Sequence, residues 1–284
     1  MGLSVVLFGI TQIVFFALST LALVAASFYF ESKESKNQGG DLLQSLAFAL
    51  GAWVFLTLLL NSSSPVNIIT SCSMLPDFER GDLIFLSGTP IRAPVKNIAE
   101  NLSKVTYETF VIQQSDGRPV ANLRQPVLNG KPLFEPQIGV CERKGSVADQ
   151  VVCTKNMTLQ GIPILPSKEN SVVVYDSKTP AGLIIHRAYA LLNATDGTYL
   201  LTKGDNNAFL DQQTGFNLIQ LQKEQRVLAG LPFLGALTTE GLQGESALTH
   251  KGNVLLRIPY IGYIKLLVFL QIQAPPGCDS VLKS

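Results

Sequence analysis

The chain has 284 residues and a net charge of +1, and 46% of its residues are hydrophobic while 15% are charged. A chain of this length can build one or two hydrophobic cores. The near-neutral charge excludes the strongly basic surface with which many proteins bind nucleic acid. The charged fraction is low for a soluble protein, so part of the chain is expected to lie in a membrane.

Two apolar stretches near the N-terminus account for this composition. Residues 3–30 and residues 42–60 contain no Asp, Glu, Lys or Arg. At a rise of about 1.5 Å per residue, each stretch is long enough to cross a hydrocarbon core of about 30 Å. We predict a transmembrane helix in each, within a membrane domain of residues 1–60. The alternatives are a cleavable signal peptide for the first stretch, although it lacks a basic leading segment, and a buried core helix for the second.

The polar connector between these stretches indicates their orientation. Residues 31–41 carry Lys33 and Lys36, which favour the cytoplasmic side because lysine and arginine accumulate in cytoplasmic loops. Everything after residue 61 is then expected outside the cytoplasm. Four N-glycosylation acceptor patterns agree with this placement, because all follow the second apolar stretch; they begin at Asn61, Asn101, Asn156 and Asn193.

The four cysteines also lie after the apolar stretches. Cys141 and Cys153 are twelve positions apart in a polar, turn-rich segment. A disulfide between them would constrain the unfolded chain by about 3 kcal/mol in an oxidising compartment, and two free thiols are the alternative. Cys72 and Cys278 have no predicted partner. No Cys/His spacing indicates a zinc site, so the sequence predicts neither a metal nor another cofactor.

Short apolar runs separated by Gly, Pro, Asn and Asp follow the membrane domain and predict an antiparallel β domain. The runs cover residues 83–86, 110–113, 172–175, 183–192, 198–202 and 254–258, and one short helix is expected within 216–229. We assign residues 61–90 and 171–264 to a β core and residues 91–170, which are rich in Pro, Asn, Lys and Gly, to an inserted cap. Residues 265–284 are expected to touch the membrane; a short third span within 258–272 is the alternative, although Lys265 would lie inside it.

Candidate chemistry begins directly after the second apolar stretch. The segment Ser71-Cys72-Ser73-Met74-Leu75-Pro76 precedes Gly81-Asp82 and the first β-run. A hydroxyl at this place is a candidate nucleophile at a membrane surface, provided that the chain also supplies a base and an orienting carboxylate. Without these partners, the segment is a serine-rich loop that leads into a strand.

A candidate base and two candidate acids lie later in the chain. His186 sits in the strand-like run 182–189, and a histidine can accept a proton near neutral pH if another group orients it, although a lone strand histidine is more often structural. His250 lies in a turn-like context. Asp205 belongs to Lys-Gly-Asp-Asn-Asn, which also suits a tight turn, and Asp211 follows six positions later. A hairpin through residues 193–197 would bring these acids back towards His186.

In combination, these motifs resemble type I signal peptidases of the archaeal and endoplasmic-reticulum branch. The resemblance rests on Ser-x-Ser-Met-x-Pro with Gly-Asp shortly after, then Ile-His-Arg, then Lys-Gly-Asp-Asn-Asn with a second Asp, in the family's order. Residues 258–264 are similar to the C-terminal end of archaeal members. The lysine base of the bacterial branch, with its basic run ahead of Pro-Gly-Asp, is absent from the sequence.

The resemblance implies a role for each matching residue. Ser73 would be the nucleophile and His186 the general base. Asp211 would orient His186, and Asp205 is the family's second acidic position, with a role in orientation or in structure. Ser71 would complete an oxyanion hole together with the Ser73 backbone N–H.

The resemblance also implies a fold, an activity and a location. The fold would be an antiparallel β catalytic domain of signal-peptidase type, with Met74 lining the substrate cleft near the lipid. The activity would be that of a membrane-bound serine endopeptidase that removes signal peptides from exported preproteins by cutting after small residues on the trans side. The protein would be multi-pass in the cell membrane or the endoplasmic-reticulum membrane, with its catalytic domain on the extracytoplasmic side. Its partners would be preproteins, membrane lipids and the secretory translocon.

Two departures leave alternatives open. Cys72 replaces the small or polar residue usual between the two serines, and the insertion of residues 91–170 is larger than the family core requires. A Ser-Lys peptidase of the repressor-cleaving type would need a DNA-binding domain in place of the apolar stretches. The other alternative is a membrane-anchored, non-catalytic β domain that binds exported chains.

Overall fold

The computed structural model describes residues 38–62, 64–113, 118–145, 149–176, 183–221, 250–268, 275 and 277–283. The chain divides into two compact units, residues 1–65 with 225–239 and residues 66–224 with 240–284.

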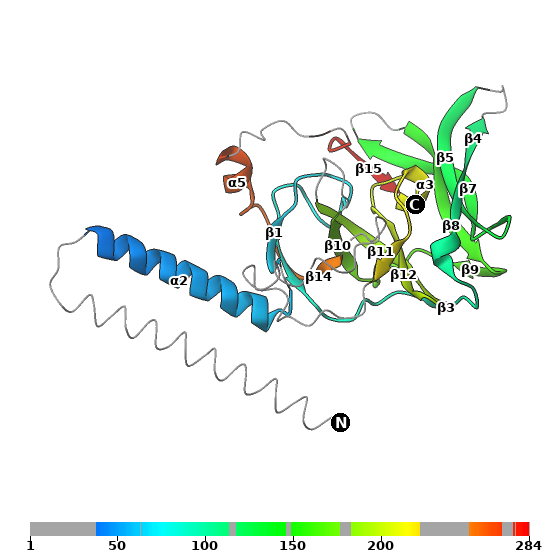
Figure 1. The fold of residues 1–284 in the computed structure, drawn as a ribbon. Coiled ribbons are helices and arrows are strands. Elements are labelled where there is room, and N and C mark those ends of the chain that lie inside the picture. The colour runs from blue at the N-terminus through cyan, green and yellow to red at the C-terminus, as the bar shows by residue number, and fades with distance from the viewer. Residues whose placement is uncertain are drawn as a thin grey trace. The chain divides into compact units, whose positions relative to one another are not determined.

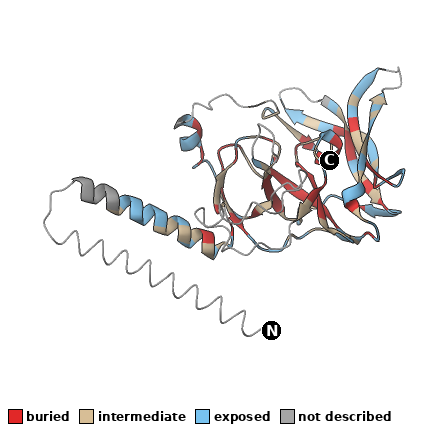
Figure 2. Cartoon of the chain, in the orientation of Figure 1, coloured by how far each residue is buried: buried red, intermediate tan, exposed pale blue. Residues whose placement is uncertain are grey.

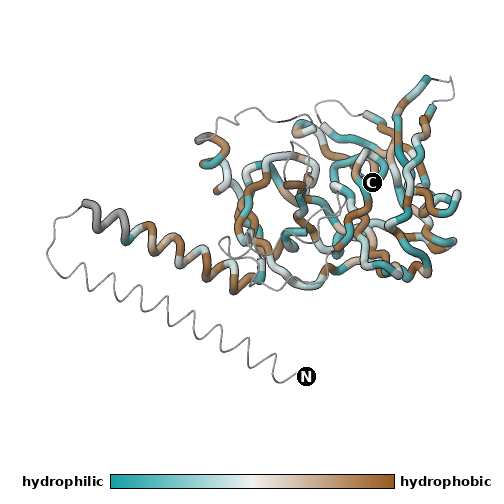
Figure 3. Tube along the Cα trace, viewed as in Figure 1, coloured by the Kyte–Doolittle hydropathy of each residue, from teal (hydrophilic) through white to brown (hydrophobic). Residues whose placement is uncertain are grey.

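The described part of the first unit is helix α2 (Gln38–Leu59), which is apolar along most of its length (Figure 3). Large apolar side chains on several sides of it are exposed: Leu46, Phe48, Leu50, Trp53, Phe55 and Leu59. The first predicted membrane stretch, residues 3–30, lies outside the described residues. Within the part of the chain that the structure describes, no helix is both long and apolar enough to span a membrane, so the prediction of two spanning helices is not supported.

The second unit is mainly antiparallel β, as predicted (Figure 1). Its largest sheet in the described residues runs in the order β1-β2-β14-β10-β11-β12-β13, and β3 adds to β11 in parallel. The strands are β1 (Val66–Ile68), β2 (Leu83–Ser87), β3 (Val95–Asn97), β10 (Val172–Asp176), β11 (Leu183–Ala194), β12 (Gly197–Lys203), β13 (Ile219–Leu221) and β14 (His250–Ile258). Because β13 pairs with β12, residues 219–221 do not form the helix predicted within 216–229.

Two smaller sheets come mostly from the insertion. One runs β15-β7-β8-β9 and the other β4-β5-β6. Their strands are β4 (Thr106–Gln113), β5 (Pro119–Leu128), β6 (Lys131–Pro132), β7 (Glu135–Gly145), β8 (Asp149–Leu159), β9 (Ile162–Ile164) and β15 (Ser280–Lys283). Short helices are η1 (Leu102–Lys104), α3 (Asp211–Thr214) and α5 (Tyr263–Val268). The C-terminal strand β15 thus pairs with the insertion strand β7.

The centre of the large sheet is buried on both faces. Strands β10, β11 and β12 consist of nearly continuous buried residues, rich in Val, Ile and Leu (Figure 2). Branched side chains favour the extended backbone and pack well on a pleated surface. These three strands form the rigid platform from which the candidate site is built.

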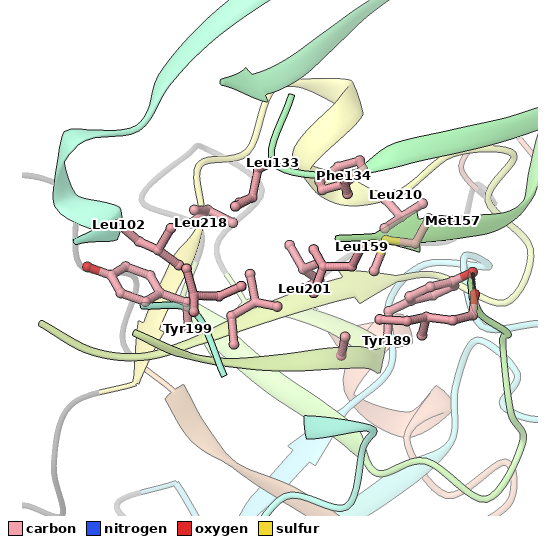
Figure 4. Packing of buried hydrophobic residues seen from close by; sticks show 14 of the residues in the cluster. Leu102, Leu133, Phe134, Met157, Leu159, Tyr189, Tyr199, Leu201, Leu210 and Leu218 are labelled. Atoms are coloured by element: carbon pink, nitrogen blue, oxygen red, sulfur yellow. Dashed lines mark hydrogen bonds between the residues drawn. The ribbon is translucent and has the colours of Figure 1, made fainter. Parts of the chain in front are cut away.

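The insertion shares a hydrophobic core with this platform (Figure 4). Phe134, Met157 and Leu159 from the insertion pack in one buried cluster with Tyr189 and Leu201 from the central strands. Each fully buried side chain of this size contributes about 1.5–3 kcal/mol. Residues 91–170 are therefore held to the β core by a common apolar interior.

Two disulfides lie within the second unit. Cys141 of β7 is bonded to Cys153 of β8, the pair that the sequence suggested. Cys72 is bonded to Cys278, a pairing across 206 positions that was not predicted. No free cysteine remains in the described residues.

Candidate active site

The candidate nucleophile, Ser73, lies in the turn between β1 and β2 and is partly exposed. The turn is anchored by its next residue, Met74, whose side chain is completely buried among Ile69 and Ile84. The Ser71 Oγ lies 3.3 Å from the Ser73 Oγ. The two hydroxyls of the motif are thus neighbours at the end of a segment fixed by core packing.

The candidate base and acid meet on the central strands. His186 is in β11, and Asp211 begins α3, which follows β12 and the Lys-Gly-Asp-Asn-Asn loop. The β11–β12 hairpin returns the chain, so that His186 Nδ1 lies 2.7 Å from Asp211 Oδ2. The exposed fractions of the two side chains are 7% and 1%. A buried carboxylate at Nδ1 fixes the ring orientation and leaves Nε2 as the nitrogen that can accept a proton.

Two buried hydroxyls bind the same carboxylate oxygen. Tyr175 OH donates a 2.8 Å hydrogen bond to Asp211 Oδ2, and Thr202 Oγ1 donates to it as well. Burial and the neighbouring Asp211 charge raise the pKa of Tyr175 far above its ordinary value, so the phenol remains a donor. Neither residue belongs to a motif that marks it in the sequence. The only available signal was their place in the predicted strands 172–175 and 198–202.

Asp205 lies in a different network. Its Oδ1 is 2.9 Å from Arg187 Nε and its Oδ2 is 2.8 Å from another Arg187 nitrogen, with Lys168 Nζ at 3.2 Å. Arg187 also binds Asp77, at 2.7 Å. Although burial raises the pKa of Asp205, Arg187 and Lys168 lower it below its usual range. None of the described hydrogen bonds joins Asp205 to His186, and its network instead links the segment after Ser73 to β11.

The candidate nucleophile Ser73 and the candidate base His186 are not joined by a described hydrogen bond. None of the described hydrogen bonds joins Ser73 Oγ to His186; instead, His186 Nε2 faces the Asn207 side-chain amide at 3.4 Å. Gly204 lets its own backbone lie close to the nucleophile turn and to Asn207, because a Cβ there would lie 2.7 Å from both the Asn207 amide and the Ser73 carbonyl. Catalytic hydrogen bonds are often loose without substrate and tighten in the complex. Asn207 is a further neighbour of the base that the sequence reasoning did not single out.

A small pocket opens beside Ser71. Its volume is about 40 Å³, and residues 67–71 and 183–185 with Ile84 and Val174 line it. Met74 is not among the lining residues, so its role in the cleft stays a prediction. In the described residues, no group of three or more His, Cys, Asp or Glu side chains is arranged to hold a metal ion.

Comparisons with known proteins find similar catalytic subunits in fungi. The signal peptidase complex catalytic subunit SEC11 of Coccidioides posadasii is 46% identical over 166 residues, which cover 58% of this chain and 60% of that protein. The catalytic subunit sec11 of Schizosaccharomyces pombe is 25% identical over 204 residues, or 70% of this chain and 78% of that protein. The subunit of Arthroderma benhamiae is 45% identical over 53 residues, so the chain spans only 26% of that relative.

No family model matches the chain, and no solved structure matches it. The similarity to these fungal subunits agrees with the motif order from which the resemblance was inferred. We conclude that the chain resembles type I signal peptidases of the endoplasmic-reticulum branch, as its motifs indicated.

Proposed function

We propose that the chain is a serine endopeptidase that removes signal peptides from exported preproteins. The observation that carries the proposal is the 2.7 Å contact between His186 Nδ1 and the buried Asp211 carboxylate. This pair lies in a chain whose Ser73 motif and whose relatives both point to the same family. A positioned histidine-carboxylate pair beside a hydroxyl is the arrangement that activates a serine nucleophile.

In the proposed reaction, the Ser73 hydroxyl attacks the scissile carbonyl while His186 Nε2 takes its proton. Asp211 keeps the ring in place and stabilises the imidazolium that forms. His186 then gives the proton to the leaving amine, which leaves an ester on Ser73. A water molecule, deprotonated by His186, hydrolyses this ester and restores the serine.

The tetrahedral intermediate needs hydrogen-bond donors for its oxyanion. The Ser71 hydroxyl, 3.3 Å from the Ser73 Oγ, and the Ser73 backbone N–H are the proposed donors. Loss of one such donor typically slows a reaction by about 10²–10³-fold. The Asn207 amide has to leave His186 Nε2 as the Ser73 hydroxyl approaches, because both need the same lone pair.

Strand β1 lies at the edge of the large sheet, next to β2 and beside the pocket. A substrate can add to this edge through main-chain hydrogen bonds, which require little of its sequence. The pocket of about 40 Å³ next to Ser71 would then select a small side chain near the cut.

Exposed apolar surfaces support attachment to a membrane. In the first unit, α2 exposes Leu and Phe side chains on several sides, which is unfavourable in water. In the second unit, residues 255–267 expose a group of large apolar side chains, including Ile264 with 70% of its surface accessible. We propose that both contact the endoplasmic-reticulum membrane or the cell membrane, that residues 1–60 anchor the chain there, and that the β unit faces the extracytoplasmic side. The two disulfides suit an oxidising compartment of this kind.

The relatives are named as the catalytic subunit of a complex. We therefore propose further subunits of such a complex as partners, besides preproteins, membrane lipids and the secretory translocon. The proposal that preproteins are the substrates is based on the resemblance to the family and on the small pocket beside Ser71.

The direct test is incubation of the purified full chain in detergent with a preprotein, followed by N-terminal sequencing of the product. The proposal predicts a single cut after a small residue at the end of the signal peptide. A chain that binds the preprotein without cutting it would instead be the non-catalytic binding domain. Cutting at unrelated positions would contradict the assigned specificity.

A further inference from the structure

The C-terminal segment is covalently joined to the residue before the candidate nucleophile. Cys278 forms a disulfide with Cys72, with their Cα atoms 5.0 Å apart. Cys72 is buried, and its carbonyl and that of Ser73 both point to the Asn206 side of the site. The proposed reaction does not involve this disulfide.

Asn206 connects the same two segments without a covalent bond. Its backbone N–H donates to the Ser73 carbonyl at 2.7 Å, and its side-chain amide donates to the Cys72 carbonyl at 3.1 Å. The same amide donates to the carbonyls of Gly277 and Ser280, at 3.1 and 2.9 Å, while its Oδ1 accepts from the Leu282 N–H at 2.7 Å. One buried side chain therefore satisfies backbone groups of both the nucleophile turn and residues 277–283.

The far side of the segment is held by the insertion. Strand β15 pairs with β7, with Ser280 opposite Gly145. A Cβ on Gly145 would lie 2.5 Å from the Asp279 carbonyl, so the close approach of the two strands requires glycine at this position. Residues 277–283 thus lie between the nucleophile turn and the sheet of the insertion, and each side binds them separately.

We propose that residues 277–283 are a positioning clamp for Ser73, in which the Cys72–Cys278 disulfide and Asn206 fix the backbone on which the nucleophile stands. This inference rests on the proposed function for its catalytic readout. Residues 277–283 do not line the pocket beside Ser71, so the clamp acts on the backbone of the nucleophile turn more than on the pocket. Its loss should therefore lower kcat and leave KM nearly unchanged. A small misplacement of a reacting group typically costs about 10²-fold in rate.

The chain contains a matched control, because its second disulfide lies in the insertion. Cys278→Ser removes the clamp disulfide, and the double variant Cys141→Ser/Cys153→Ser removes the other one. We expect kcat to fall about tenfold or more for Cys278→Ser, with KM within about twofold of the parent. The control removes a disulfide that packs against Leu282 but leaves Cys72–Cys278 intact, so its kcat should fall clearly less than that of Cys278→Ser, and both are assayed below their melting temperatures. Wild-type kcat in folded Cys278→Ser would overturn the proposal.

The control background also allows a chemical test. In Cys141→Ser/Cys153→Ser, the dithiol dithiothreitol can reduce only Cys72–Cys278: two electrons and two protons give two thiols, and the dithiol becomes a cyclic disulfide. The kcat should fall with the fraction of reduced Cys72 and recover on reoxidation. Full kcat with completely reduced Cys72 would contradict the clamp.

A variant that leaves the disulfide intact tests the hydrogen bonds alone. Asn206→Asp keeps the acceptor for Leu282 but cannot donate to Cys72, Gly277 or Ser280. Asn253→Asp is its control, because Asn253 is also buried and its amide donates to the Thr89 carbonyl in another part of the sheet. Only the Asn206 variant should lose kcat, whereas equal losses would overturn the role of Asn206.

Amide hydrogen exchange separates the clamp from the proposed function. If the wild-type chain cuts no preprotein, the peptidase proposal fails, yet the clamp still predicts faster exchange in residues 72–78 of Cys278→Ser than in the control double variant. The N–H groups of Leu75 and Phe78 report this directly, since both bond to carbonyls within the turn. Equal exchange in the two variants would overturn the clamp whether or not the chain is active.

Discussion

At the scale of single residues, the candidate site depends on one carboxylate oxygen. Asp211 Oδ2 binds His186 Nδ1, Tyr175 OH and Thr202 Oγ1 at once. Three donors around one buried oxygen leave the carboxylate little freedom to rotate. The orientation of His186 is therefore fixed from two neighbouring strands, β10 and β12, before any substrate is bound.

The two acids are expected to differ sharply when substituted. Asp211→Asn keeps the shape of the side chain but favours the wrong imidazole tautomer, so kcat should fall by about 10⁴-fold with little change in melting temperature. Asp205→Asn should weaken the Arg187 network and lower the melting temperature, with a smaller effect on kcat. Rates and melting temperatures of both purified variants decide between the roles. A dead Asp205→Asn beside an active Asp211→Asn would reverse the assignment.

Tyr175→Phe should act through Asp211. The substitution removes one donor from the carboxylate, and a hydrogen bond to a charged group is worth about 1.5–3 kcal/mol, so kcat/KM should fall about tenfold or more. Tyr189→Phe is the matched control, because Tyr189 is also buried but its OH binds the Ile164 carbonyl in the insertion core. If steady-state kinetics give the two variants equal losses, Tyr175 has no positioning role.

At the scale of elements, strands were predictable and their long-range partners were not. The runs 172–175, 183–192 and 198–202 fall within β10, β11 and β12, because buried strands show as continuous apolar sequence. The hairpin through 193–197 was predictable from its turn residues, and with it the approach of Asp211 to His186. Strand β15 was not, since residues 280–283 are few and carry no alternating pattern.

The long-range contacts around Ser73 were likewise not predictable from the sequence. Four cysteines allow three pairings, and the one that contains the short Cys141–Cys153 loop also joins Cys72 to Cys278; no local pattern indicates this second bond, because its cysteines are 206 positions apart. Asn206 looked like a turn residue, because its partners lie more than 70 positions away in both directions. Asp205 also looked like a turn residue, because its contact with Arg187 depends on the pairing of β11 with β12.

The packing of α5 on the turn before β2 gives a prediction for an element. Gly81 has a φ of +91°, and a Cβ there would lie 2.3 Å from the Tyr263 ring. Gly81→Ala should therefore displace α5 and lower the melting temperature. Gly130→Ala controls for backbone strain, because Gly130 has a φ of +75° and nothing within 4 Å of its Cβ position. Thermal unfolding should show a clearly larger loss for Gly81, and equal losses would mean that Tyr263 does not pack there.

At the scale of the whole molecule, the apolar residues fall into two groups: the N-terminal stretches and the buried clusters of the β unit. The low charged fraction comes from the apolar N-terminal stretches, while the β unit buries its apolar residues in clusters shared between core and insertion. The size of the insertion suggested a separate cap. Its common core with β11 and β12 could not be foreseen, because the contacts join residues far apart in the sequence.

Buried charge gives the stability of the molecule a pH dependence. Burial lowers the pKa of Lys203 to about 8 from its ordinary 10.5, although the Asp205 and Asp211 charges oppose the shift. The folded chain thus binds this proton less tightly than the unfolded chain. Below about pH 8, Lys203 is charged in both states, and burial of this charge lowers the free energy of unfolding by its full amount. As the pH rises towards 10.5, the folded chain loses the proton first, and the free energy of unfolding should increase by roughly 3 kcal/mol.

The measurement is the difference in unfolding free energy between the wild-type chain and Lys203→Met across this range. Comparing the two chains removes the contribution of the buried tyrosines, which titrate at high pH in both. As the pH rises, the free energy of unfolding of the wild type should increase relative to that of Lys203→Met. A constant difference between pH 7 and pH 10 would show that Lys203 keeps its ordinary pKa.

The most direct test of the account is the rate at which the full-length chain and Ser73→Ala cleave a preprotein. A methyl group cannot attack a carbonyl, so the folded Ser73→Ala variant should lose all cleavage, while Ser71→Ala should retain a rate lower by about 10²–10³-fold. N-terminal sequencing confirms that the residual product of Ser71→Ala comes from the same cut. Wild-type cleavage by Ser73→Ala, with an unchanged melting temperature, would contradict the assignment of Ser73 as the nucleophile.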